Sequence, residues 1–236
     1  MRQSQYSKTT QYPEAAHEAG ADAEAPTRVD PRLYFLMRRF GDFAKRSFPG
    51  EKIRLLDVGC ADGSFMDIVS GNLGKFVRTV DGADVPSRWL RQSSARKNGR
   101  LYLQDFQHGV GEVPENRYQA VTMWEVIEHI ENAYSLLRNI QRVMAPGGGV
   151  LLSSPNLLSV SRFIKGGRWV GVAEQDHKHL FDAQTLRMLL DRAGFVDISV
   201  RAYFLPSRGP VMDGFNRLLS ELPGGGMLFA EAFKAK

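Results

Sequence analysis

Acidic residues beside turn-forming glycines in the first half of the chain could bind a small charged molecule. Asp57 and Asp62 flank Gly59 in the stretch LLDVGCADGSF, and Asp84 follows in the stretch FVRTVDGADVP. Glycine lets a ligand approach the main chain, and the first amides of a helix lack partners within that helix. Carboxylates here repel a pyrophosphate and favour a ligand that carries a positive amino group. The stretch therefore predicts a binding site for a cationic small molecule.

Two further positions suit an adenosine group. Asp84 ends an apolar run, and its carboxylate can accept hydrogen bonds from both hydroxyls of a ribose. Asp105 ends the next run and can accept a hydrogen bond from an adenine amino group, while Phe106 or a neighbour packs on the ring. A nicotinamide nucleotide is disfavoured, because its fingerprint needs glycines at 59, 61 and 64 and the chain has Ala61 and Ser64.

Two later clusters carry groups that could act as acids, bases or metal ligands. Glu125, Glu128 and His129 lie in the stretch WEVIEH, and His177 lies in EQDHKHLFD together with Asp176 and His179. A neutral imidazole is a good general base near pH 7, so His177 is a candidate base. Its alternative role is structural, as a histidine that anchors the surrounding segment.

The elements that must position these residues alternate between apolar runs and helical patterns, which is typical of a parallel sheet covered by helices. We expect an α/β fold with a Rossmann-like, seven-stranded, mostly parallel sheet and helices on both faces, a three-layer α/β/α sandwich. The expected strands are Ile53–Val58, Phe76–Val85, Leu101–Leu103, Ala120–Trp124, Val150–Ser154, Val196–Phe204 and Met227–Phe233. The expected helices lie near Gly63–Val69, Ser87–Lys97, Asn132–Met144, Ala183–Ala193 and Met212–Leu222.

The ends of the chain differ in composition. Residues 1–27 hold few large apolar side chains and predict a flexible tail before a single domain over residues 28–236. Asp30 and Pro31 mark a helix start, and Leu33, Leu36 and Phe40 follow at helical spacing. Residues 157–181, which mix aromatic, aliphatic and basic side chains, predict a lid over the site.

Taken together, the motifs resemble the class I S-adenosylmethionine (SAM)-dependent methyltransferases. The resemblance extends over most of Leu55–Phe195 and rests on LLDVGCADG, GADVP, YQAVTMWEVIEHI and LRNIQRVMAPGGGVLLSSPN. The chain departs from many members at Ala61, where they carry glycine. Since alanine is the smallest replacement, we expect a tighter binding loop there.

The resemblance implies a role for each motif residue. Asp57, Gly59, Ala61 and Gly63 would line the methionine part of SAM, and Asp84 would bind the ribose. Asp105 and Phe106 would hold the adenine, and Trp124 would wall the reactive methyl. The Glu-x-x-Glu-His arrangement is similar to that of quinone-biosynthesis O-methyltransferases, where it is associated with a divalent metal. The same pattern is a common helix entry, so a divalent metal is an open alternative that is not favoured.

The sequence predicts methyl transfer to a small-molecule acceptor, most readily a hydroxyl oxygen, with S-adenosylhomocysteine (SAH) as product; His129, His177 and Glu125 are the candidate catalytic residues. The alternatives are an RNA methyltransferase and a non-catalytic cofactor-binding module. The net charge of +5 would suit nucleic acid, but the basic residues are scattered and the base-methylating Asn/Asp-Pro-Pro motif is missing. The single cysteine and the lack of a signal or membrane-spanning pattern favour the cytoplasm. Homodimerisation stays open.

Overall fold

The computed structural model describes residues 31–86, 99–204 and 222–236. One seven-stranded sheet runs through it in the order β3-β2-β1-β4-β5-β7-β6. All pairs from β3 to β5 are parallel, and β7 runs antiparallel to both β5 and β6. The strands are β1 Ile53–Val58, β2 Val77–Asp84, β3 Leu101–Leu103, β4 Tyr118–Trp124, β5 Met144–Pro155, β6 Phe195–Tyr203 and β7 Met227–Lys234.

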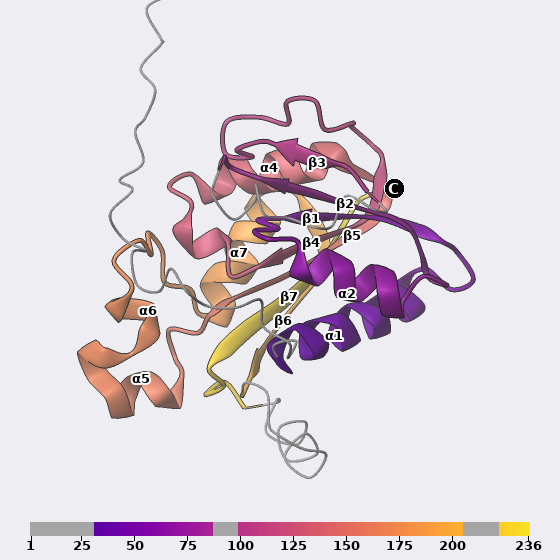
Figure 1. Cartoon of the computed structure of the whole chain (residues 1–236). Helices are drawn as coiled ribbons and strands as arrows, with labels where there is room; N and C mark the ends of the chain where they lie inside the picture. The colour runs from indigo at the N-terminus through magenta and orange to yellow at the C-terminus, as the bar shows by residue number, and fades with distance from the viewer. Residues whose placement is uncertain (1–30, 87–98, 205–221) are drawn as a thin grey trace, which may run out of the picture.

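Helices cover both faces of this sheet (Figure 1). The α1 and α2 helices pack on one face through a core that includes Phe40, Phe43 and Phe65. The α4 and α7 helices pack on the other face through a larger core that includes Leu136 and Leu186. The helices are α1 Pro31–Ser47, α2 Ser64–Asn72, α4 Ala133–Val143, α5 Val160–Lys165, α6 Val170–Ala173 and α7 Ala183–Arg192, with short 3-10 turns η3 Ile127–His129 and η4 Gly166–Arg168.

Side chains at the helix starts explain where two of these helices begin. The Asn132 side chain accepts a hydrogen bond from the Ser135 amide and caps α4. At α7, Asp182 accepts from the Thr185 amide while the Thr185 hydroxyl accepts from the Asp182 amide, which makes a reciprocal capping box. Both caps satisfy amides that a helix cannot pair internally.

The segment between β5 and α7 forms a small helical unit beside the carboxyl edge of the sheet. It contains α5, η4 and α6, and Figure 1 shows α5 and α6 lying away from the main sheet. The Trp169 ring is buried at 2 % exposure, whereas Phe163 and Ile164 are 71 % and 79 % exposed. One aromatic side chain therefore anchors this unit.

The expected α/β sandwich with a mostly parallel sheet is confirmed, with small differences in boundaries. The β4 strand begins at Tyr118 and β5 at Met144, earlier than expected, because Tyr118 and Met144 already pair across an irregular register. The expected tail and the helix at Ser87–Lys97 lie outside the described residues, as does the helix at Met212–Leu222 apart from Leu222. No helix in the described ranges is long and apolar enough to cross a membrane.

Candidate active site

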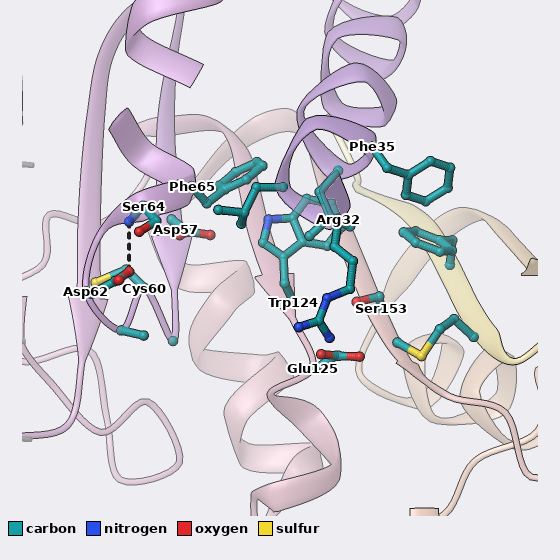
Figure 2. A pocket seen from close by; sticks show the side chains of 16 residues that line it. Arg32, Phe35, Asp57, Cys60, Asp62, Ser64, Phe65, Trp124, Glu125 and Ser153 are labelled. Carbon is teal, nitrogen blue, oxygen red and sulfur yellow. Dashed lines mark hydrogen bonds between the residues drawn. The ribbon is translucent and has the colours of Figure 1, made fainter. Parts of the chain in front are cut away.

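A pocket opens at the carboxyl end of the central strands, where parallel α/β sheets bind ligands (Figure 2). It has a volume of about 230 Å³. Its walls come from α1, the turn after β1, and the ends of β4, β5 and β7. The residues that line it are Arg32, Leu33, Phe35, Leu36, Asp57, Gly59, Cys60, Ala61, Asp62, Ser64, Phe65, Trp124, Glu125, Ser153, Met227 and Phe229.

The turn after β1 needs small residues with unusual backbone angles. Gly59 has a φ of 75°, and a Cβ there would lie 2.3 Å from Cγ2 of Val126. Ala61 is also left-handed, with a φ of 47°, a conformation that glycine adopts at lower cost. The Ala61 amide donates a 2.7 Å hydrogen bond to Oδ2 of Asp84, which ties this turn to the end of β2.

Asp57 is a buried acid at the base of the pocket, and its pKa is well above the usual range of an aspartate. Its side chain is 2 % exposed, and the Thr122 hydroxyl donates a 2.7 Å hydrogen bond to its Oδ1. Burial raises the pKa of Asp57 to about 7, Thr122 opposes that shift, and the nearby Asp84 adds to it. A ligand cation beside this carboxyl would favour its charged form.

Aromatic rings build one wall of the pocket. The rings of Trp124 and Phe65 meet edge to face at 5.2 Å, and Phe229 lies 6.3 Å from Trp124. Phe35 of α1 packs edge to face on Phe229 at 5.6 Å. The predicted position of Trp124 at the pocket is therefore found, and aromatic rings from α1, α2 and β7 surround it.

Glu125 and Arg32 face each other across the pocket mouth (Figure 2). Glu125 follows β4 with a left-handed φ of 55° that turns its side chain toward the pocket. Desolvation raises the pKa of Glu125, while the positive charge of Arg32 lowers it and the carboxylate of Glu174 raises it. The side chain stays accessible to a ligand, since it is exposed within the open mouth.

His129 and His177 form a separate cluster beside the segment that was predicted to be a lid, residues 157–181. Their rings meet at 4.7 Å, and Nδ1 of His129 lies 3.2 Å from Asp176. Nδ1 of His177 lies 3.1 Å from the Gly171 carbonyl, and its side chain is 6 % exposed. Neither histidine is among the residues that line the pocket. This geometry favours the anchoring role of His177 over the role of general base.

Glu128 lies close to these two histidines. It is 1 % exposed, neither carboxyl oxygen has a hydrogen-bond partner among the described residues, and burial raises its pKa to about 8. Glu128, His129 and His177 bring potential metal ligands within 4.8 Å of one another. The suspected trio of Glu125, Glu128 and His129 is thus divided, because Glu125 turns to the pocket. That a divalent metal is not favoured at this cluster stays a prediction.

The residues predicted for the adenosine half lie beside the pocket, outside its lining. Asp84 accepts hydrogen bonds from the Ala61 and Val85 amides, and burial raises its pKa. Asp105 accepts bonds from the Gln107 main chain and side chain. Phe106 is 2 % exposed and packs in the core, so its ring has no free face for adenine. Of the expected adenine contacts, only Asp105 keeps a partly exposed side chain.

Four residues that line the pocket were not predicted from the sequence, namely Arg32, Ser153, Met227 and Phe229. No local motif marks them, because α1 and β7 reach this edge only through the tertiary fold. The charges nevertheless fit SAM. Asp57 suits its ammonium group, and Arg32 can meet its carboxylate at the other side. A pyrophosphate would face Asp57 and Asp62.

Comparisons with known proteins agree with this fold and pocket. Residues 32–200 match the model of a family described as a methyltransferase domain, and the chain belongs to this family. A SAM-dependent methyltransferase from Archaeoglobus fulgidus superposes with a TM-score of 0.61 at 20 % identity, covering 86 % of this chain and 94 % of that one. The fold is also similar to phosphoethanolamine N-methyltransferase 2 of Haemonchus contortus, solved with SAM, with a TM-score of 0.58 at 20 % identity over 84 % of this chain and 53 % of that one.

Among curated relatives, the ubiquinone biosynthesis O-methyltransferase of Maricaulis maris is 29 % identical over 188 residues, which cover 75 % of this chain and 70 % of the relative. The namesake enzyme of Dinoroseobacter shibae is 26 % identical over 180 residues, or 72 % of this chain and 70 % of the relative. The chain is therefore a SAM-dependent methyltransferase, as the sequence motifs predicted.

Proposed function

We propose that this enzyme transfers the methyl group of SAM to a hydroxyl oxygen of a small planar acceptor, such as a phenol. The observation that carries the proposal is the position of the Glu125 carboxylate at the mouth of a pocket walled by Trp124, Phe65 and Phe229. Aromatic walls suit a planar ring. A carboxylate at the mouth supplies a proton acceptor, which an oxygen nucleophile needs and an already neutral amine does not.

Four side chains would each contact a different part of SAM. Asp57 would pair with the ammonium group of SAM, Arg32 with its carboxylate, and Asp84 with its ribose hydroxyls, while Trp124 would close the space beside the methyl group. SAM, when bound, supplies a sulfonium methyl that passes to the acceptor in one displacement and leaves SAH. Holding the two reactants in line accounts for much of the rate, since proximity lowers a barrier by about 7–11 kcal/mol.

Glu125 would act on the acceptor proton. As the oxygen–carbon bond forms, the hydroxyl proton passes to the Glu125 carboxylate, so the neutral ether leaves with no charge on oxygen. Desolvation, the largest effect, raises the pKa of Glu125, and the Arg32 guanidinium lowers it. A base with a raised pKa acts only above that pKa, so turnover should rise as the pH increases through the titration of Glu125.

The test measures methyl transfer from labelled SAM to a panel of catechols, phenols and matched anilines. We expect transfer to the hydroxyl compounds, and a fall of about 100-fold in kcat for Glu125→Gln with SAH affinity unchanged. Glu112→Gln, at an exposed loop position, is the matched control. Transfer to anilines alone, or full activity of Glu125→Gln, would contradict the proposed chemistry. Transfer to RNA would point to the alternative acceptor class, and binding of SAH without any transfer to a non-catalytic module.

A further inference from the structure

A second cavity lies on the α1 face of the sheet, between α1 and the strands β6 and β7. It has a volume of about 310 Å³ and is lined by Arg39, Arg46, Ser199, Arg201, Tyr203, Phe229 and Glu231. Alternate residues of a strand point to one face, and Ser199 pairs with Glu231 while Arg201 pairs with Phe229. Arg39 and Arg46 lie two turns apart on α1 and meet this face from above. We call it the arginine pocket.

Positive charge exceeds negative charge in the arginine pocket. Three guanidinium groups line it together with one carboxylate, that of Glu231. Arg46 pairs with Glu231 at 2.5 Å, and its side chain is 59 % exposed. Arg39 and Arg201 supply the other two guanidinium groups of the lining.

Arg39 holds a donor that protein atoms do not satisfy. Its Nη2 donates a 2.7 Å hydrogen bond to the Tyr203 hydroxyl, and its guanidinium lies 4.5 Å from the centre of the Tyr203 ring. The Nε atom is buried and has no hydrogen-bond partner among the described residues. An unpaired donor on a charged group is costly, and an anion in the cavity would remove that cost.

We propose that the arginine pocket binds the phosphate group of a small phosphomonoester. Guanidinium groups present paired donors that match phosphate oxygens, and the hydroxyls of Ser199 and Tyr203 add neutral partners at the rim. A cavity of about 310 Å³ is larger than an inorganic phosphate ion needs, which leaves space for the esterified part. This site is separate from the methyl-transfer pocket, whose acids repel phosphate.

The arginine pocket shares one wall with the cofactor pocket. Phe229 lines both cavities, and its ring contacts Tyr203 at 5.2 Å on one side and Trp124 at 6.3 Å on the other. The Arg39 guanidinium also lies 5.9 Å from the Phe229 ring. An anion that reorients Arg39 would act on the ring that borders the SAM site, so occupancy of the pocket should change SAH affinity by about two- to fivefold.

The experiment uses the full chain saturated with SAH, so that the cofactor pocket cannot bind the probe. Titration calorimetry with glycerol 3-phosphate, in chloride buffer of matched ionic strength, should show binding at a single site. Arg39→Gln and Ser199→Asp should each weaken that binding at least tenfold, while Arg192→Gln, an exposed arginine at the end of α7 on the opposite face, should not. Ser199→Asp removes no packing ring or guanidinium, so it tests the site even where Arg39→Gln destabilises the fold.

A second arm separates the two sources of a phosphate group. Phosphatidylcholine vesicles with and without phosphatidic acid are tested for cosedimentation with the same variants. Binding to glycerol 3-phosphate supports a soluble ester, and binding to the acidic vesicles alone, lost in both pocket variants, assigns the phosphate to a lipid. The inference is overturned by absence of binding in both arms, or by equal binding to the wild type and the pocket variants. Neither outcome bears on methyl transfer, which is measured independently.

Discussion

At the scale of single residues, burial makes it costly to ionise the Asp57 carboxyl at the base of the cofactor pocket. Asp57 is 2 % exposed, and its pKa rises from 3.8 to about 7 on folding because burial disfavours the carboxylate. The unfolded chain gives up this proton from about pH 4, whereas the folded chain keeps it until about pH 7. Between these values the folded state binds more protons, so the free energy of unfolding should fall as the pH rises.

We therefore expect Asp57→Asn to remove this part of the pH dependence. The variant should gain stability relative to the wild type between pH 5 and pH 7, on the order of 2 kcal/mol, as measured by urea unfolding without cofactor. Asp42→Asn, at an exposed site on α1, is the control and should follow the wild-type profile. Parallel profiles for the wild type and Asp57→Asn would show that Asp57 titrates normally in the folded protein.

The second prediction at the scale of residues concerns the left-handed backbone conformation of Ala61. Its φ of 47° is left-handed, and a side chain in that conformation costs about 1–2 kcal/mol. Ala61→Gly should remove this strain, partly offset by the greater freedom of glycine in the unfolded chain, for a net gain of about 0.5–1 kcal/mol in thermal unfolding. SAH affinity should stay within twofold. A clear loss of stability would mean that the Ala61 methyl group makes a packing contact that outweighs its strain.

How far the sequence predicts the site depends on whether a residue belongs to a local motif. Asp57 and Gly59 were predicted because a strand end and a turn mark them, the place of Trp124 was implied by the family resemblance, and all three line the pocket. Arg32 and Phe229 were not, since α1 and β7 meet the pocket only after the sheet has assembled. Phe106 lies after a strand end, as the pattern indicates, but the pattern cannot show how far its side chain is buried, and the residue is 2 % exposed in the structure.

At the scale of elements, the predicted lid, residues 157–181, contains a buried aromatic side chain, Trp169. The Trp169 ring is buried, and a Cβ added at Gly171 would lie 2.1 Å from that ring. The Gly171 carbonyl also lies 3.1 Å from Nδ1 of His177. The contact needs glycine at 171, so the lid and the histidine cluster share one small residue.

Gly171→Ala should therefore displace Trp169 and misplace the lid. We expect kcat/KM for the acceptor to fall about tenfold or more, while SAH affinity changes less than twofold, because no lid residue lines the cofactor pocket. Gly167→Ala is the matched control, since a Cβ there meets nothing within 4 Å. Equal activity of both variants would separate the lid from acceptor binding, and equal loss of SAH affinity would place it over the cofactor.

At the scale of the whole molecule, the seven strands and the three layers were predictable because apolar runs alternate with helical patterns. The length of β5 was not, since the stretch Gly147–Gly149 has the composition of a turn but lies within β5, where Gly149 pairs with Ala120 of β4. Neighbouring strands decide that assignment, and local propensity cannot supply it. The same long-range assembly brings α1 over the carboxyl edge of the sheet.

Because the pocket walls come from α1, β1, β4, β5 and β7, a bound cofactor joins elements from both ends of the chain. A ligand that binds only the folded state at 100 times its Kd adds about 2.7 kcal/mol to the free energy of unfolding. For a domain of this size, that corresponds to a rise of about 5–11 °C in Tm. We expect SAM and SAH to produce such a shift by differential scanning fluorimetry, and Asp84→Asn to reduce it by at least half. NAD and NADP should leave the Tm within 1 °C at the same concentration, since Asp57 and Asp62 oppose a pyrophosphate; a rise with these nucleotides and none with SAH would refute the assignment of the pocket to SAM.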